Sequence, residues 1–347
     1  MSDESGLRAG ARPVKMSDLA RIAGVSASTV SRALADHPAI PEATRSTIQA
    51  LASKHGYVVN RAARNLRQSQ TQTIAVAVPL GHEREQLISD PFFLRLFGHL
   101  ADEISQRRYD ILLVREPSPD AHWLGRLFRS QRADGFIIVG QSDQHEALNL
   151  AAKHFRPLVV FGSELPRQIY CSVGSDNFEG GRLATEHLLR SGRRHILFVG
   201  PAELPQIDLR LEGYRRALRG GGIEPDDGLI LPAHFTGQSA YDAVRQAIAR
   251  GVRFDGIFAA SDGIALSAIR AVEAAGRHCP QNVSVVGFDD SDLASQSSPA
   301  LTSVRQDVPD IAAKLVDHLF RRLAGEDTRS ATLPVRLVIR ESAPLQG

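Results

Sequence analysis

From Thr73 onward, short apolar runs alternate with amphipathic segments along the chain. Each run is bounded by turn residues and carries few charges, a pattern typical of strands buried on both faces of a sheet. The runs lie at residues 73–79, 109–114, 135–140, 157–162, 195–200, 254–261 and 283–289. We therefore predict an α/β fold in which parallel strands are flanked by helices.

The segments between these runs show helical periodicity. One apolar stripe is formed at spacings i, i+3, i+4, i+7 and i+11 by Phe93, Leu96, Phe97, Leu100 and Ile104. Further helices are expected around residues 183–189 and 265–275. About 270 residues exceed one ordinary sheet domain, so we expect two α/β lobes, with a ligand beyond the carboxyl ends of the strands.

The first part of the chain has a different pattern, that of three short helices at residues 18–23, 27–35 and 42–55. Ser17 and Ser26 are expected to cap the first two, and Gly24 to end the first. A small core is expected from Leu19, Ile22, Ala23, Val30 and Leu34. Two helices joined by a tight glycine turn and braced by a third predict a helix-turn-helix.

These patterns divide the chain into five parts. Residues 14–59 form the headpiece, 60–72 a short hinge helix and polar linker, and 73–342 the core. Residues 1–13 and 343–347 are expected to be tails.

Charge is spread unevenly over these parts. Residues 1–70 hold ten Lys/Arg and five Asp/Glu, whereas the rest of the chain holds 31 Lys/Arg and 34 Asp/Glu. A basic N-terminal segment on a near-neutral body favours a nucleic-acid-binding headpiece, although a solvated basic face would have the same composition.

Other classes of protein find little support. The two cysteines, Cys171 and Cys279, form neither a disulfide scaffold nor a metal-binding spacing. We find no signal peptide, no membrane-length apolar run, and no complete nucleophile-elbow, P-loop, zinc-protease or dinucleotide motif. We therefore expect a cytoplasmic protein that is not an enzyme and has no metal and no cofactor.

Several stretches together resemble the LacI/GalR family of bacterial transcription repressors, over residues 14 to 342. They include "VKMSDLARIAGVSASTVSRAL" (14–34), "HGYVVNRAARNLR" (55–67), "VGSDNFEGGRLATEHLLRSGRRHILFVGP" (173–201) and "VSVVGFDDSDLA" (283–294). The resemblance implies a helix-turn-helix headpiece, a core like the periplasmic sugar-binding proteins, and a homodimer on a pseudo-palindromic double-stranded DNA operator. A small effector in the cleft would shift operator affinity by binding two states unequally.

The resemblance places DNA contacts on the second helix and the hinge. Arg32 is the one long cationic donor on the groove face, and its alternative is an ordinary surface arginine. Leu66 would wedge into the minor groove, or else pack on the core. Val59 departs from the proline usual before the hinge. The complete set is Ser17, Ser26, Ala27, Ser28, Thr29, Ser31, Arg32, Asn60, Arg61, Ala63 and Leu66.

The resemblance also indicates effector contacts. Arg210 matches an effector-contacting arginine, with a salt bridge to Asp208 or Glu212 as the alternative. Asp262 could line the cleft or cap a helix, and Trp123 is a further stacking candidate. The predicted effector set is Asp90, Phe92, Phe161, Arg210, Ser261, Asp262 and Asp289.

Carboxylates and one arginine around an aromatic face favour a carbohydrate effector. A purine or nucleoside and a sugar phosphate remain alternatives. A sugar-binding protein or an enzyme without a DNA role is the less favoured class. Gly162 stands where several sugar-responsive relatives have an acid, so no particular sugar is indicated.

Overall fold

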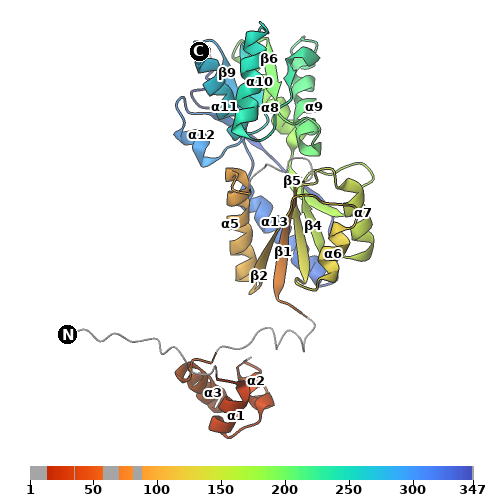
Figure 1. Ribbon diagram of the computed structural model, residues 1–347, viewed down its shortest axis with the longest axis vertical. Helices are drawn as coiled ribbons and strands as arrows, with labels where there is room; N and C mark the ends of the chain where they lie inside the picture. The colour runs from red at the N-terminus through yellow and green to blue at the C-terminus, as the bar shows by residue number, and fades with distance from the viewer. Residues whose placement is uncertain (1–13, 35, 58–69, 81–87, 346–347) are drawn as a thin grey trace, which may run out of the picture. The chain divides into compact units, whose positions relative to one another are not determined.

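The computed structural model describes residues 14–34, 36–57, 70–80 and 88–345. They belong to two compact units, residues 1–70 and 71–347, which are treated separately below. The first unit is the headpiece and the second is the core (Figure 1).

The headpiece consists of three helices, α1 (Met16–Ala23), α2 (Ala27–Ala33) and α3 (Glu42–Lys54). Gly24 ends α1 with φ 66°, as predicted. Ser26 caps α2, accepting a 3.1 Å hydrogen bond from the Thr29 backbone N–H. The predicted Ser17 cap is wrong, because α1 begins at Met16 and the Lys15 backbone N–H donates to the Asp18 carboxylate instead.

A small apolar core holds the three helices together. Its buried members are Leu19, Ala20, Val30, Ala33, Ile40, Ile48 and Ala52. Ile22 was expected here but is 45% exposed. At about 100° per residue, Ile22 lies about 60° from Leu19 but about 160° from Ala20 around α1, at the edge of the face that these two bury.

The first lobe of the core is a six-stranded, wholly parallel sheet in the order β11-β5-β4-β3-β1-β2. Its strands are β1 (Thr73–Pro79), β2 (Asp110–Glu116), β3 (Gly135–Val139), β4 (Leu158–Phe161), β5 (Cys171–Ser175) and β11 (Ala331–Leu333). Helices α5 (Pro91–Gln106) and α13 (Val308–Leu323) pack on one face, and α6 (Trp123–Arg129) and α7 (His145–His154) on the other. We call this the N-lobe.

The second lobe, the C-lobe, repeats this plan in the order β12-β10-β9-β8-β6-β7, with only the edge strand β12 antiparallel. Its strands are β6 (Ile196–Val199), β7 (Ile230–Leu231), β8 (Gly256–Ala259), β9 (Ser284–Asp289), β10 (Thr302–Arg305) and β12 (Arg336–Val338). Its helices are α8 (Asn177–Arg190), α9 (Pro205–Gly220), α10 (Gly237–Ala249), α11 (Asp262–Glu273), α12 (Asp292–Gln296) and the short 3-10 helix η1 (Asp227–Leu229). Helix α8 packs on α9, and α10 on α11.

The predicted α/β fold with two lobes is confirmed, and each of the seven predicted runs contains a strand. Strands β5, β7, β10, β11 and β12 were not predicted, because they are short or carry polar residues. Strand β2 is not buried on both faces, since it is an edge strand that exposes Ile111 and Leu113.

The chain crosses between the lobes three times, which brings distant segments together. The crossings follow β5, follow β10, and join β11 to β12. Asn177, at the start of α8, and Gln306, just after β10, lie at two of them. Within the described ranges, no helix is both long and apolar enough to cross a membrane.

Candidate functional site

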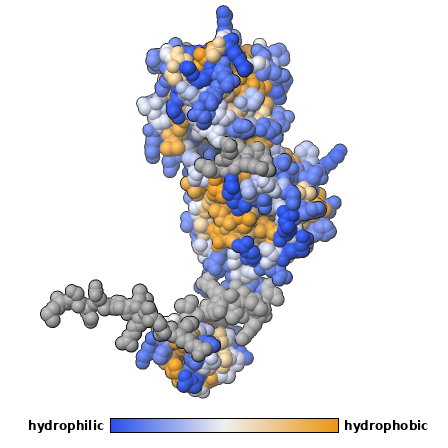
Figure 2. Space-filling model, in the orientation of Figure 1, coloured by the Kyte–Doolittle hydropathy of each residue, from blue (hydrophilic) through white to orange (hydrophobic). Residues whose placement is uncertain are grey.

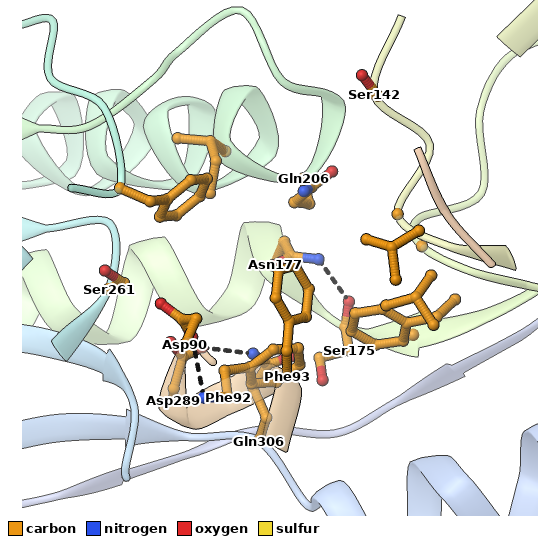
Figure 3. Close-up of a pocket in the computed structure, with 18 of the residues that line it drawn as sticks. Asp90, Phe92, Phe93, Ser142, Ser175, Asn177, Gln206, Ser261, Asp289 and Gln306 are labelled. Atoms are coloured by element: carbon orange, nitrogen blue, oxygen red, sulfur yellow. Dashed lines mark hydrogen bonds between the residues drawn. The ribbon is translucent and has the colours of Figure 1, made fainter. Parts of the chain in front are cut away.

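A pocket lies between the two lobes, where the carboxyl ends of both sheets face each other, as expected for parallel sheets (Figure 3). Backbone and side chains at the ends of β3, β4 and β5 line it from the N-lobe, and Ser261 and Asp289 follow or end β8 and β9 in the C-lobe. Of the predicted effector set, the lining includes Asp90, Phe92, Phe161, Arg210, Ser261 and Asp289.

Arg210 is the one cation among the described lining residues, and its side chain is held on several sides. Its Nε donates to Asn177 Oδ1 at 2.8 Å, its Nη1 donates to the Ala260 carbonyl, and its guanidinium lies 3.4 Å from the Phe288 ring centroid. Among the residues that the structure describes, no ion pair joins Arg210 to Asp208 or Glu212, the alternative considered above. Burial lowers the pKa of Arg210 to about 10, while the charges of Asp289 and Asp262 act in the opposite direction.

Two carboxyl groups face the pocket near this arginine. Burial raises the pKa of Asp289 well above its usual range, although Arg210 opposes the shift. Asp289 Oδ1 accepts a 2.7 Å hydrogen bond from Gln306 Nε2. Asp90 caps α5 by accepting from the Phe92 backbone N–H at 2.9 Å, and burial raises its pKa as well. Both groups are suited to accept hydrogen bonds from ligand hydroxyls.

Asp262 does not line the pocket. Its carboxylate lies behind the lining, where it accepts from Ser303 Oγ and the Ser291 backbone N–H, both at 2.6 Å. The cap of α11 is Ser261, not Asp262. Burial raises the pKa of Asp262 to about 6. We therefore remove Asp262 from the effector contacts and assign it to the packing of the β9–α12 loop.

Aromatic side chains form much of the wall. The ring centroids of Phe92 and Phe161 lie 5.5 Å apart, and those of Phe92 and Phe93 lie 6.1 Å apart. Trp123, the other predicted stacking candidate, is instead in the N-lobe core, where its Nε1 donates to Gln144 Oε1 at 2.9 Å. Phe235 adds an aromatic ring from the C-lobe.

Several polar lining residues were missed by the sequence analysis: Ser142, Ser175, Asn177, Gln206 and Gln306. Ser142 could have been found, since it closely follows the carboxyl end of the predicted strand at 135–140. Ser175 could not, because it ends β5, which was not predicted. Gln206 lies in the first turn of α9 and Gln306 on a crossover. No periodic pattern in the sequence marks either position.

The predicted DNA-reading face of α2 is exposed. Ala27, Ser28 and Arg32 are open to solvent, while Thr29 and Ser31 are half-buried. The Ser26 hydroxyl lies 2.8 Å from both the Ser28 and Thr29 hydroxyls. Ser17 is exposed on α1. The hinge candidates Asn60, Arg61, Ala63 and Leu66 lie outside the described residues.

Comparison with known proteins supports this two-part description. The family model "Bacterial regulatory proteins, lacI family" matches residues 15–60, and "Periplasmic binding protein-like domain" matches residues 185–343. The transcriptional regulator CelR of Thermobifida fusca is 34% identical over 325 residues, covering 92% of this chain and 94% of CelR.

Solved structures show the same likeness. A CelR–cellobiose complex has a TM-score of 0.71 at 32% identity, covering 95% of this chain and all of that one. A lac repressor dimer bound to operator and an anti-inducer has a TM-score of 0.85 at 26% identity, covering 96% of this chain and 99% of that one. With its helix-turn-helix headpiece and two-lobed core, the chain belongs to the lacI family of bacterial regulatory proteins, which control transcription by binding DNA.

Proposed function

We propose that the protein represses transcription as a homodimer on a pseudo-palindromic operator, and that a carbohydrate in the pocket between the lobes controls its operator affinity. The observation that carries this is the origin of the pocket lining. Asp90 and Phe161 come from the N-lobe, Ser261 and Asp289 from the C-lobe, and Gln306 from a crossover. A ligand that contacts both lobes and the crossover shifts the equilibrium between two relative positions of the lobes if it binds these two conformations with different affinities.

The chemistry of the pocket favours a neutral polyol. Asp90 and Asp289 supply acceptors for hydroxyl groups, and the Phe92–Phe161 pair supplies an apolar face. A phosphate is disfavoured, because two carboxyl groups lie in the same pocket and Arg210 already bonds to Asn177 and Ala260. A CelR–cellobiose complex is among the solved structures that this chain resembles, at 32% identity.

A thermal-shift screen on the full chain tests the effector class. Ligand bound only to the folded protein stabilises it by RT ln(1 + [L]/Kd), about 2.7 kcal/mol at a hundredfold excess over Kd. We expect a sugar to raise the melting temperature and nucleosides and sugar phosphates to leave it unchanged. If only a nucleoside raises the melting temperature, the effector is a nucleoside and not a carbohydrate, and the proposed regulatory role still holds.

We also infer that the protein acts in the cytoplasm, where its operator is, and that it does not turn its effector over. The relatives that this chain matches over more than nine-tenths of its length are transcriptional regulators, which supports this inference. Product formation from a bound sugar would contradict this inference.

Dimer formation has a suitable surface on the N-lobe. Leu94 of α5 is 55% exposed and Leu113 of β2 is 47% exposed, with Ile111 beside it on the same edge strand. Figure 2 shows an apolar area over α5 and the strands next to it. An exposed apolar edge strand invites pairing with another surface, and a second copy of the chain would cover it.

Leu113→Glu is expected to convert the dimer to a monomer, because it places a charge on this surface, and to weaken operator binding at least tenfold. Light scattering at micromolar concentration and an operator titration measure both. Leu150→Glu, an equally exposed leucine on α7, is the matched control and should stay dimeric. If the Leu113→Glu protein remains a dimer, the dimer interface does not include this surface.

Leu66 remains a prediction from sequence, since it lies outside the described residues. If it wedges into the minor groove, Leu66→Ala should reduce operator affinity more than affinity for random DNA, because only the specific complex uses the kinked step. Competition titrations at one fixed salt concentration measure the ratio. An equal loss on both DNAs would argue that Leu66 packs on protein.

A further inference from the structure

The side chain of Asp134 holds the first residues of the core in place. Its Oδ1 accepts hydrogen bonds from the Thr71 backbone N–H at 2.6 Å and from Thr71 Oγ1 at 2.9 Å. Its Oδ2 accepts from the Gln72 backbone N–H at 2.8 Å. Hydrogen bonds to a carboxylate are roughly twice as strong as those between neutral groups, so three of them fix this segment firmly. We call Asp134, Thr71 and Gln72 the linker clamp.

The backbone inside the linker clamp is bent. Gln72 has φ 50°, in the left-handed region that residues other than glycine seldom adopt. Its carbonyl accepts a 2.8 Å hydrogen bond from the Asp110 N–H at the start of β2, and the Asp134 N–H donates to the Thr73 carbonyl at 2.9 Å. Bonds to the starts of two neighbouring strands therefore determine the direction in which the chain enters β1.

The C-lobe contains the same arrangement without the linker. Asp255 precedes β8 as Asp134 precedes β3, and the strand pairing that follows has the same register in both lobes. The Asp255 carboxylate accepts from the backbone N–H groups of Arg194, at 3.0 Å, and His195, at 2.8 Å. These two residues lie between α8 and β6, inside the C-lobe. Only the N-lobe clamp holds residues that directly follow the predicted linker.

The two strands beside the linker clamp also reach the effector pocket. Strands β1 and β3 pair in parallel, and Val78, Pro79 and Val139 at their carboxyl ends line the pocket. A strand rises about 3.3 Å per residue, so the seven residues of β1 span about 20 Å. Asp134 is not among the described residues that line the pocket. The linker clamp therefore lies at the opposite ends of these strands from the pocket.

We propose that Asp134 is a positioning residue for DNA binding, an inference that rests on the dimer and the two-half-site operator proposed above. The linker clamp fixes the direction in which each core releases its linker, and so restricts the region that each headpiece of a dimer can reach. This restriction raises the effective concentration of the second headpiece at its half-site once the first is bound. It also makes binding depend on the separation of the half-sites.

Three DNA duplexes test this role in the full chain: the duplex that the wild type selects most strongly from random DNA, the same duplex with one half-site scrambled, and the same duplex with two base pairs inserted at its centre. Asp134→Asn presents an NH2 group, which cannot accept, to one of the N–H donors. We expect affinity for the selected duplex to fall about tenfold and for the scrambled duplex less than about twofold. The loss of affinity caused by the insertion should become at least about threefold smaller, because a freer linker tolerates a changed spacing.

Asp255→Asn is the matched control, since it makes the same change in the equivalent clamp of the C-lobe. It should leave all three affinities within about twofold of the wild type, even where it lowers the melting temperature as much as Asp134→Asn does. If Asp134→Asn changes the affinities no more than this control, or equally on all three duplexes, Asp134 only supports the start of the strands and the positioning role is wrong.

Thr71 gives a second, milder test that remains available if Asp134→Asn does not fold. Thr71→Val removes one of the three hydrogen bonds and should change the affinities in the same direction but less, whereas Thr71→Ser keeps the hydroxyl and should match the wild type. Identical behaviour of the two variants would count against the linker clamp. If the wild type binds the selected and scrambled duplexes equally, the two-half-site operator itself is wrong.

Discussion

Arg210→Ala is expected to abolish the effector response and to lower the free energy of unfolding by about 3 kcal/mol, the usual cost of removing one partner of a buried ionic group. The side chain is 5% exposed, and its loss leaves Asn177 Oδ1 and the Ala260 carbonyl without their donor. It also removes the positive charge that faces Asp289 and Asp262. Effector titration and chemical denaturation measure the two effects.

Two further variants separate binding from stability in this experiment. Arg210→Lys keeps the charge but cannot reproduce the planar contact with Phe288 together with two directed hydrogen bonds, so it should recover stability in part and effector binding little. Arg216→Ala, an exposed arginine on the same helix, should leave both unchanged. A normal effector response from Arg210→Ala would remove Arg210 from the site.

Arg32→Ala is expected to weaken operator binding by roughly 1–3 kcal/mol, or about 5-fold to 150-fold, the range for one good contact to a base edge. Arg32 is exposed in the last turn of α2 and pairs with none of the acids in the described headpiece, so its guanidinium is available to DNA. Binding should be measured on operator and on random DNA at the same salt concentration.

The control for this prediction comes from the same headpiece. Arg45 in α3 forms an ion pair with Glu42, and its Nε lies 3.8 Å from Asp36 Oδ1. Because its guanidinium is already paired with acids of the headpiece, Arg45→Ala should reduce operator affinity far less than Arg32→Ala. If Arg32→Ala reduces binding equally on every sequence, the side chain contacts phosphate and does not read a base. If it changes binding on neither DNA, α2 is not the reading helix.

The geometry of α2 gives its small residues a role. Ala27 and Ser28 are exposed and short, which allows the helix to approach base edges closely. The Ser28 hydroxyl is also within 2.8 Å of the capping residue Ser26, so substitution there would disturb the helix start as well as the surface. Arg32 is therefore the cleaner position at which to test DNA reading.

Features that depend on neighbours in the chain were predictable from the sequence alone. The apolar runs that became β1, β3 and β9 have the length and composition of buried strands, and Ser26 and Gly24 terminate helices through contacts three or four residues away. The two-lobed α/β plan followed from these runs together with the length of the region that they span, about 270 residues. Resemblance to a family, with the rule that ligands sit at strand ends, also placed Asp289 and Arg210 at the pocket.

Features that depend on contacts between distant segments were decided only by the tertiary structure. Asp262 comes shortly after β8 and Asp289 ends β9, yet Ser303 and Ser291 donate hydrogen bonds to Asp262 and hold it behind the pocket, whereas Asp289 lines it. Ser175 and Gln206 are 31 positions apart and belong to different lobes. Both line one pocket because the three crossovers bring the lobes together, and spacing along the chain does not reveal that packing.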